Sequence, residues 1–247
     1  MLAMLRTKLT KMPYLNYIKD SDLEDAVGFM LAAAESGQET AKKKFARNVI
    51  DPFAVVFEMV GFDIPTVAEW EKSEQARQAQ KTLGQALGDF HQRVLGSIKG
   101  WENLGVGNNI DLFCPSKKII AEVKNKHNTV TGGQLSALYH GLDDLVMPKS
   151  SKYHRHTAYY VEIIPKKGES YDVEFTPSDR TRSKKCPANP KIRKIDGKSF
   201  YALASGKDDA LPKLYEALPN VIKTVCGKSY AAKELMLMEN YFKAAFK

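Results

Sequence analysis

The sequence predicts an α/β protein in which a central mixed β-sheet is flanked by helices and the N-terminal third is largely helical. Three observations predict this class. Helical periodicity dominates residues 1–100, short β-rich runs bounded by turn residues follow, and a strand–helix–strand order across 119–164 favours parallel pairing. The 247 residues, 43% of them hydrophobic, suit one domain over 1–247, with a mainly helical part at 1–100 and the sheet and closing helices at 101–247.

Capping signals and apolar spacing mark the expected N-terminal helices. Residues 21–24 (SDLE) have the form of a capping box, and the apolar run 26–34 follows them. Asp51-Pro52 predicts an N-cap followed by proline at the first helical position, leading into residues 53–60. A long helix ending near Gly100 is expected, because apolar residues recur at three- and four-residue steps after Pro65. These residues are Leu83, Leu87, Phe90, Val94 and Ile98.

The expected strands begin after a turn cluster at 105–109. Residues 110–113 and 119–124 have strand character and are separated by the turn 115–118, so they are predicted to pair as a hairpin. The run TAYYVEII at 157–164 is typical of a buried strand. The remaining expected elements are a helix at 134–146, an edge strand at 171–175, and closing helices at 209–218 and 229–246.

Composition limits the class of partner and the compartment. The 37 Lys and Arg against 29 Asp and Glu give a net charge of +8, which fits either a polyanionic partner or a basic enzyme without one. The three cysteines are far apart and form no CxxC pair, which argues against a disulfide framework and a structural zinc site. No apolar run reaches the roughly 18 residues of a membrane span, and residues 1–11 lack the apolar core of a signal peptide. We expect a cytoplasmic protein with no membrane partner.

The chemistry-bearing pattern is Asp111, ten residues, then Glu122-Val123-Lys124. Strand periodicity places Glu122 and Lys124 on one face, and a hairpin brings Asp111 beside Glu122. Two adjacent carboxylates repel each other, and a divalent cation such as Mg²⁺, which prefers oxygen ligands, relieves that repulsion. Lys124 would hold or activate a water molecule and stabilise charge on a phosphate. The alternative is a charged hairpin whose Glu122 and Lys124 lie on a solvated face.

The segment GVGNNIDLFCPSKKIIAEVKNKHNT, with the earlier GDFHQRVLGSIKGWENL and the later LPKLYEALPNVI, resembles type II restriction endonucleases of the PD-(D/E)xK superfamily. The branch it resembles recognises GGNCC or GGWCC sites. The resemblance extends from near Arg47 to Ile222. It implies site-specific double-strand DNA cleavage with Mg²⁺ as cofactor, by a homodimer that matches a palindromic site.

The resemblance also implies roles for particular residues. Asp111 and Glu122 would be metal ligands, the Val123 backbone carbonyl would join them, and Lys124 would be the catalytic lysine. Ile110 stands where the motif's name has proline. Many members have a further acid on the long helix, where this chain offers only Asp89. Asp89 is therefore either a possible accessory acid or a solvated side chain, and one or two metal ions fit the pattern.

Two segments are expected to contact double-stranded DNA. The first follows the catalytic strand directly, so Lys126 and Asn128 are candidates for phosphate or base contacts. His127 is either a metal ligand or, as we favour, a DNA-facing or structural residue. The second is the basic DNA-reading segment 178–198, which shows little apolar periodicity; its alternative is a solvated basic loop. The candidate DNA-binding residues are Lys126, His127, Asn128, Thr129, Arg180, Arg182, Lys184, Lys185 and Arg193.

Within segment 178–198, the arginines are expected to contact guanine and the lysines to contact phosphates. Two rival functions remain at this point. One is a PD-(D/E)xK nuclease of DNA repair or recombination. The other is a basic DNA-binding protein that cuts nothing, in which Asp111 and Glu122 serve in a structural ionic contact.

Overall fold

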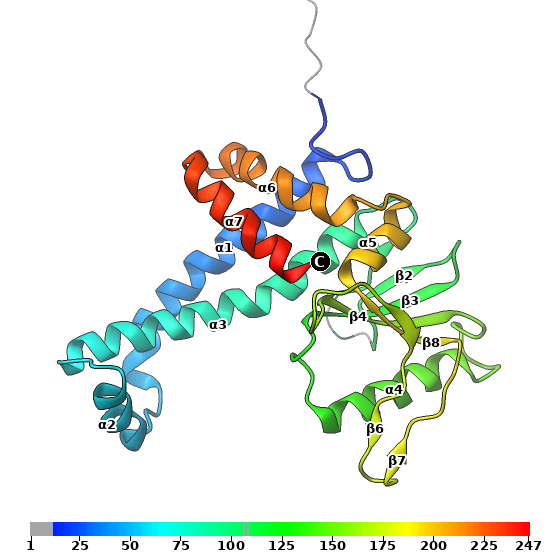
Figure 1. The fold of residues 1–247 in the computed structure, drawn as a ribbon, viewed down its shortest axis with the longest axis horizontal. Coiled ribbons are helices and arrows are strands. Elements are labelled where there is room, and N and C mark those ends of the chain that lie inside the picture. Colours follow the sequence, from blue (N-terminus) through cyan, green and yellow to red (C-terminus); the bar gives the residue numbers. More distant parts are fainter. Residues whose placement is uncertain (1–11, 106, 108) are drawn as a thin grey trace, which may run out of the picture.

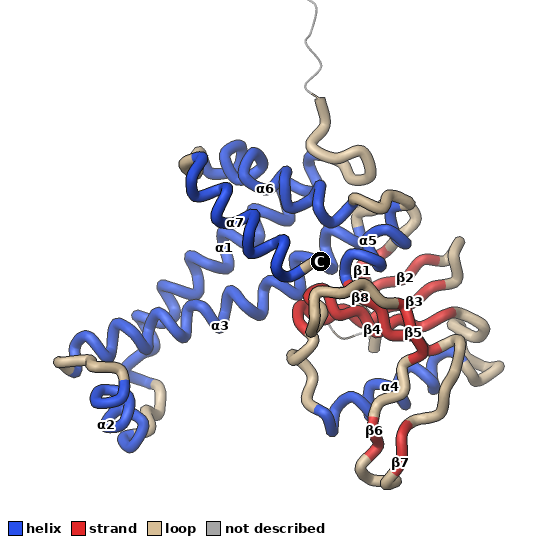
Figure 2. The backbone as a smooth tube through the Cα atoms, in the orientation of Figure 1, coloured by secondary structure: helices blue, strands red, loops and turns tan. Residues whose placement is uncertain are grey.

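A six-stranded mixed sheet forms the centre of the protein, as the sequence predicts (Figures 1 and 2). The computed structural model describes residues 12–105, 107 and 109–247. The strand order is β1-β2-β3-β4-β8-β5; β3, β4 and β8 are parallel, and the other neighbours pair antiparallel. The strands are β1 (Glu102–Asn103), β2 (Leu112–Cys114), β3 (Ile119–Lys126), β4 (Thr157–Ile164), β5 (Asp172–Glu174) and β8 (Ile192–Asp196).

The two faces of the sheet carry separate apolar cores. On one face, alternate residues such as Ala121, Val123 and Val161 pack under four helices, which are α1 (Asp20–Lys44), α3 (Val67–Gly96), α5 (Gly197–Ser205) and α6 (Ala210–Cys226). On the other face, Ile120 and Tyr160 pack with residues of α4 (Gly132–Val146). A last helix, α7 (Ala232–Ala245), lies beside α6 (Figure 1). None of the helices in the described ranges is long and apolar enough to cross a membrane.

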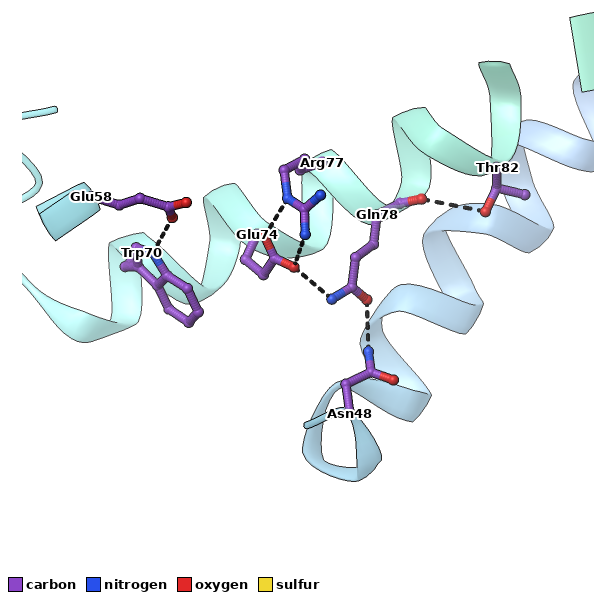
Figure 3. A network of polar contacts seen from close by, with 7 residues as sticks. All are labelled: Asn48, Glu58, Trp70, Glu74, Arg77, Gln78 and Thr82. Carbon is purple, nitrogen blue, oxygen red and sulfur yellow. Dashed lines mark hydrogen bonds and ion pairs between the residues drawn. The ribbon is translucent and has the colours of Figure 1, made fainter. Parts of the chain in front are cut away.

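Helices α1 and α3 run antiparallel and extend beyond the sheet as an arm. The arm's tip is formed by a short 3₁₀ helix (Phe45–Arg47) and α2 (Pro52–Gly61), far from the strands in Figure 1. Gly37 allows the close approach of α1 and α3, because a Cβ there would lie 3.2 Å from Thr82 Cβ. Where α3 approaches the tip, Glu74, Arg77, Gln78 and Asn48 form a polar network along it (Figure 3).

The predicted helices are present, with corrections at two ends. The Asp51 carboxylate accepts from the Phe53 and Ala54 amides, which confirms that N-cap. The capping box at 21–24 is wrong, since the first helical bond of α1 already runs from the Leu23 amide to the Lys19 carbonyl. Helix α3 ends at Gly96 rather than near Gly100, and there the chain folds back so tightly that a Cβ on Gly96 would lie 2.5 Å from Asn103 Cβ.

The hairpin of β2 and β3, the parallel pairing of β3 with β4 and the edge strand β5 are confirmed. The second half of segment 178–198 is neither a DNA-reading loop nor a solvated loop, although it shows little apolar periodicity: β8 lies inside the sheet, and its Ile192 and Ile195 are buried. The first half forms a two-stranded hairpin, β6 (Ser178–Asp179) with β7 (Lys184–Lys185). Of the turn cluster 105–109, both glycines have positive φ, while positions 106 and 108 lie outside the described residues, as does segment 1–11.

Candidate active site

Asp111 lies immediately before β2, at the end of the hairpin where the pairing of β2 with β3 stops. Its backbone amide donates to the Ala121 carbonyl at 3.0 Å, and its carbonyl accepts from the Leu104 amide at 2.9 Å. Further along β3, the Val123 amide has no backbone partner on β2 and donates to the Asp111 carboxylate at 2.7 Å. The side chain of Asp111 therefore takes the place of a backbone partner on β3, which fixes its position beside Glu122.

Glu122 and Lys124 lie on one face of β3, as the strand period predicts. The Lys124 ammonium donates to the Glu122 carboxylate at 2.6 Å, and the two side chains are only 30% and 15% exposed. This is the face on which Ile120, two residues earlier, belongs to the core under α4. The alternative of a solvated charged face is therefore wrong, because the pair is partly buried at the edge of a core.

The surroundings of Asp111 disfavour its charge. Burial raises the pKa of Asp111 to about 6, and the negative charges of Glu122 and Asp89 act in the same direction. The Val123 amide and Lys124 lower the pKa of this carboxyl without cancelling the increase. Asp89, the possible accessory acid, is exposed on α3, and its negative charge makes the smallest of the contributions that raise the pKa of Asp111.

Lys124 keeps its proton in the same surroundings. Burial lowers the pKa of Lys124, but its hydrogen bond and charge pairing with Glu122, together with the charge of Asp111, raise it above its ordinary value. The site thus contains one fixed ammonium and two carboxylates, a net negative charge before Asp89 is added.

These residues fit a divalent cation. Asp111 and Glu122 provide carboxylate oxygens, and a strand residue directs its N–H and C=O to the same side, so the Val123 carbonyl opens toward Asp111. Hard oxygen donors of this kind suit Mg²⁺. Burial and the negative charge of Glu122 raise the pKa of Asp111, and a bound cation would favour its charged form.

A further polar group on the same face was missed from the sequence. Glu162 on β4 pairs in register with Lys124 and is 2% exposed. Its carboxylate contacts the Lys194 ammonium at 3.0 Å and the Tyr171 hydroxyl at 2.6 Å. The signal for it was present, since Glu162 is the one charged residue in the apolar run 157–164. Because its charge is already compensated, Glu162 borders the site without supplying a free ligand.

The segment after β3 extends from the site into a turn. Thr129 is used locally, as its hydroxyl accepts from the Lys126 amide at 3.2 Å and its amide donates to the Lys126 carbonyl. Lys126 and Asn128 are exposed. The His127 Nδ1 atom is buried without a hydrogen-bond partner, and within the described ranges His127 belongs to no group of three metal-ligand side chains.

The β6–β7 hairpin carries four of the candidate DNA-binding residues, Arg180, Arg182, Lys184 and Lys185, all exposed. Its base is anchored by Asp179, which is buried and accepts from the backbone amides of residues 181 and 182 at 3.1 and 3.3 Å. His140 on α4 lies 3.1 Å from the same carboxylate, and this hydrogen bond lowers the pKa of Asp179.

Cys186 completes this cluster, since its sulfur and ligand atoms of His140 and Asp179 all lie within 4.8 Å of one another. The Asp179 carboxylate already contacts His140, two backbone amides and the Arg182 guanidinium, the last at 3.6 Å. The cluster therefore ties the hairpin to α4 through hydrogen bonds.

Arg193 does not lie on the β6–β7 hairpin with the other candidate DNA-binding arginines. It lies on β8, where its guanidinium contacts Asp172 at 2.6 Å and the Asp172 carbonyl at 2.8 Å. Register pairs its neighbour Lys194 with Tyr160 and Tyr160 with Glu122, so Arg193 points to the opposite face of the sheet.

A mixed sheet that presents two carboxylates and a lysine in this order is the arrangement expected of a metal-dependent nuclease. Residues 15–227 match the family described as Eco47II restriction endonuclease. The chain is 48% identical over 217 residues to the type II restriction enzyme Eco47II of Escherichia coli, covering 88% of this chain and 90% of that one. It is 32% identical over 210 residues to the type II restriction enzyme Sau96I of Staphylococcus aureus, covering 83% and 78%.

The chain belongs to the Eco47II restriction endonuclease family. It is a type II restriction endonuclease that cleaves DNA at specific sites, and the family is typically metal-dependent. This confirms the resemblance found in the sequence, and it favours restriction over the two rival functions, repair and non-catalytic DNA binding.

Proposed function

We propose that Asp111, Glu122 and Lys124 form the catalytic centre of this endonuclease and that Mg²⁺ is its cofactor. The observation that carries the proposal is the Asp111 carboxylate held on the Val123 amide beside the bonded pair of Glu122 and Lys124. Asp111, Glu122 and the Val123 carbonyl would hold the ion. Asp89, which raises the pKa of Asp111 from α3, is the candidate ligand for a second ion.

The chain's own residues position the reactants. Glu122 accepts from Lys124 and thereby fixes the position of its ammonium, which keeps two further N–H donors. Lys124 donates a hydrogen bond to the attacking water or to a phosphate oxygen, which aligns the water with the scissile bond. A bound divalent ion lowers the pKa of water and stabilises charge on the phosphate and the leaving oxygen. The attacking water forms the new P–O bond and gives up one proton to solvent, while the P–O bond to the leaving oxygen breaks and a solvent water supplies the proton that this oxygen takes up.

Sequence specificity would come from the β6–β7 hairpin. Arginine presents paired donors that suit guanine O6 and N7, and Arg180 is exposed at the turn of the hairpin. Arg182 would act similarly, Lys184 and Lys185 would contact phosphates, and Lys126 to Thr129 would contact the backbone beside the scissile bond. Arg193 leaves this set, because it is bonded to Asp172 on the other face.

The target would be a palindromic site of the GGNCC or GGWCC kind, cut by a homodimer with one centre for each strand. Residues 1–247 would act as one endonuclease domain, which the continuous core from α1 to α6 supports. The protein would work in the cytoplasm, where incoming DNA is met; this rests on the relatives' being bacterial restriction enzymes.

Plasmid DNA incubated with the protein and Mg²⁺ tests the proposal. Discrete fragments whose sequenced ends share one GGNCC or GGWCC position support it. Structure-dependent nicking would instead indicate a repair nuclease, and retarded but intact DNA would indicate a DNA-binding protein without catalysis.

A further inference from the structure

Helix α2 at the tip of the arm exposes an apolar stripe. Its ten residues include none that is buried. Phe53, Val56, Phe57 and Val60 are 75%, 62%, 75% and 77% exposed and recur at the i, i+3, i+4, i+7 spacing of one helical face. Val49 and Phe62, 101% and 71% exposed, flank this set. We call Phe53, Val56, Phe57 and Val60 the α2 stripe.

The stripe is presented by an anchored helix. On its other side, α2 carries Glu58, whose carboxylate accepts from the Trp70 indole nitrogen of α3 at 2.8 Å (Figure 3). Trp70 is buried and also contacts the Phe45 ring, with centroids 6.4 Å apart. Since Glu58 is the one charged residue of α2 and faces Trp70, the stripe itself carries no charge.

We infer that the α2 stripe is a subunit interface that packs against the α2 stripe of a second copy of this chain. Exposed patches of this size on a folded helix mark interaction sites. Phenylalanine buries about 150–250 Å² when covered, so the two phenylalanines and two valines of the stripe at these exposures offer on the order of 500 Å². That is more than half of the roughly 800 Å² that each partner contributes to a standard interface.

The second copy is favoured over a foreign partner for two reasons. An uncharged helical stripe is self-complementary about a two-fold axis, because the same ridge of side chains packs against its own copy with the helices crossing antiparallel. The inference also rests on the proposed function: each chain carries one Asp111–Glu122–Lys124 group, so cutting both strands of a palindromic site requires two copies.

Light scattering on the purified full chain tests the inference. Wild type is expected at twice the chain mass of 27.6 kDa at micromolar concentration. The double variant Phe53→Glu with Phe57→Glu is expected at the mass of one chain, with an unchanged circular dichroism spectrum. The matched control is Met236→Glu with Tyr241→Glu, an equally drastic change at residues of α7 that are 68% and 78% exposed, and it is expected to remain dimeric. A monomeric wild type, a dimeric stripe variant, or a control that alone dissociates would each overturn the inference.

Crosslinking keeps the test valid should the double variant misfold. In a Cys226→Ser background, which removes the exposed cysteine, Val56→Cys is expected to form covalent dimers, while Met236→Cys is not. Absence of the Val56→Cys dimer would contradict the interface.

Plasmid cleavage separates this inference from the proposed function. If both hold, wild type linearises the plasmid directly and the stripe variant leaves nicked circles. If wild type is dimeric through α2 but cuts no DNA, the proposed function fails while the interface stands. If wild type cuts both strands while dimeric through another surface, the interface fails alone.

Discussion

The site face of β3 and the tip of the arm depart from ordinary burial in opposite directions. On β3, Glu122 and Lys124 are charged and yet mostly covered, beside an Asp111 whose pKa is raised to about 6. On α2, Phe53 and Phe57 are apolar and yet three-quarters exposed. Both arrangements lower the stability of the isolated chain. The proposed cation would relieve the first, and the proposed second copy would relieve the other.

The two regions are expected to affect different steps, catalysis in one and subunit pairing in the other. Removing a charge from β3 should abolish chemistry while leaving the fold and the dimer intact. Removing apolar surface from α2 should leave each active centre intact and change only its pairing with a second centre. Substitutions outside these two regions should have smaller effects on cleavage and on dimer formation.

The largest effect is expected for the charged face. Asp111→Ala, Glu122→Ala and Lys124→Ala should each reduce cleavage by roughly a thousandfold or more, because the cation ligands or the ammonium that aligns the water is lost. Cleavage is measured in single turnover with binding followed in Ca²⁺. The matched control is Glu174→Ala, an exposed carboxylate on β5 of the same sheet, which should cut normally. Near-normal cleavage by any of the three variants would show that the site is misplaced.

The charged side chains at the turn of the β6–β7 hairpin are exposed, so substituting them should change DNA binding and leave the stability of the fold unchanged. Arg180→Ala is expected to lose about 1–3 kcal/mol of binding to the cognate duplex and little to a scrambled one. Lys184→Ala should weaken both duplexes alike and lower the salt slope by about one unit. Arg180 is a cleaner test than Arg182, whose guanidinium also contacts Asp179. Equal losses on both duplexes for Arg180→Ala would limit the hairpin to backbone contacts.

A stability measurement sharpens the claim that the β3 face is strained without its cation. In chelator at pH 8, Asp111→Asn should be about 1–2 kcal/mol more stable than wild type, a value reduced from the full shift because Asp111 is only half-buried. Folding raises the pKa of Asp111 from 3.8 to about 6, so as pH falls the folded chain binds a proton at Asp111 before the unfolded chain does. Wild type therefore gains stability as pH falls from 6 toward 4. The advantage of the variant should shrink over that window. An advantage that grows in acid would contradict the sign of the shift.

The smallest effect is expected at the base of the stripe. Trp70→Phe removes the hydrogen bond that holds Glu58 and should cost about 1 kcal/mol. Hydrogen exchange should quicken in α2 and the end of α1 but not in β3. Thr66→Val, which removes the N-cap contact of α3 with Glu69, serves as a control for general loosening of the arm. Uniform quickening across the sheet would show that the arm and the sheet do not behave as separate regions.

The sequence predicted the parts of this molecule whose signals are local. Strand periodicity placed Glu122 and Lys124 on one face, the run 157–164 gave β4 with its observed bounds, and Asp51 was found as an N-cap. Strand β8 was missed because its buried Ile192 and Ile195 are separated by Arg193 and Lys194, whose charges are balanced by residues distant in sequence. The stripe on α2 was also beyond prediction, since an apolar run resembles any core helix until its packing is known.

We propose above that Asp111, Glu122 and the Val123 carbonyl hold the catalytic ion. Crystals grown with Mn²⁺ in place of Mg²⁺ test it directly through the anomalous signal of the metal. A peak between these three ligands, lost in Asp111→Asn crystals, is the result expected. A peak only at the cluster of His140, Asp179 and Cys186, or none beside Asp111, would contradict it.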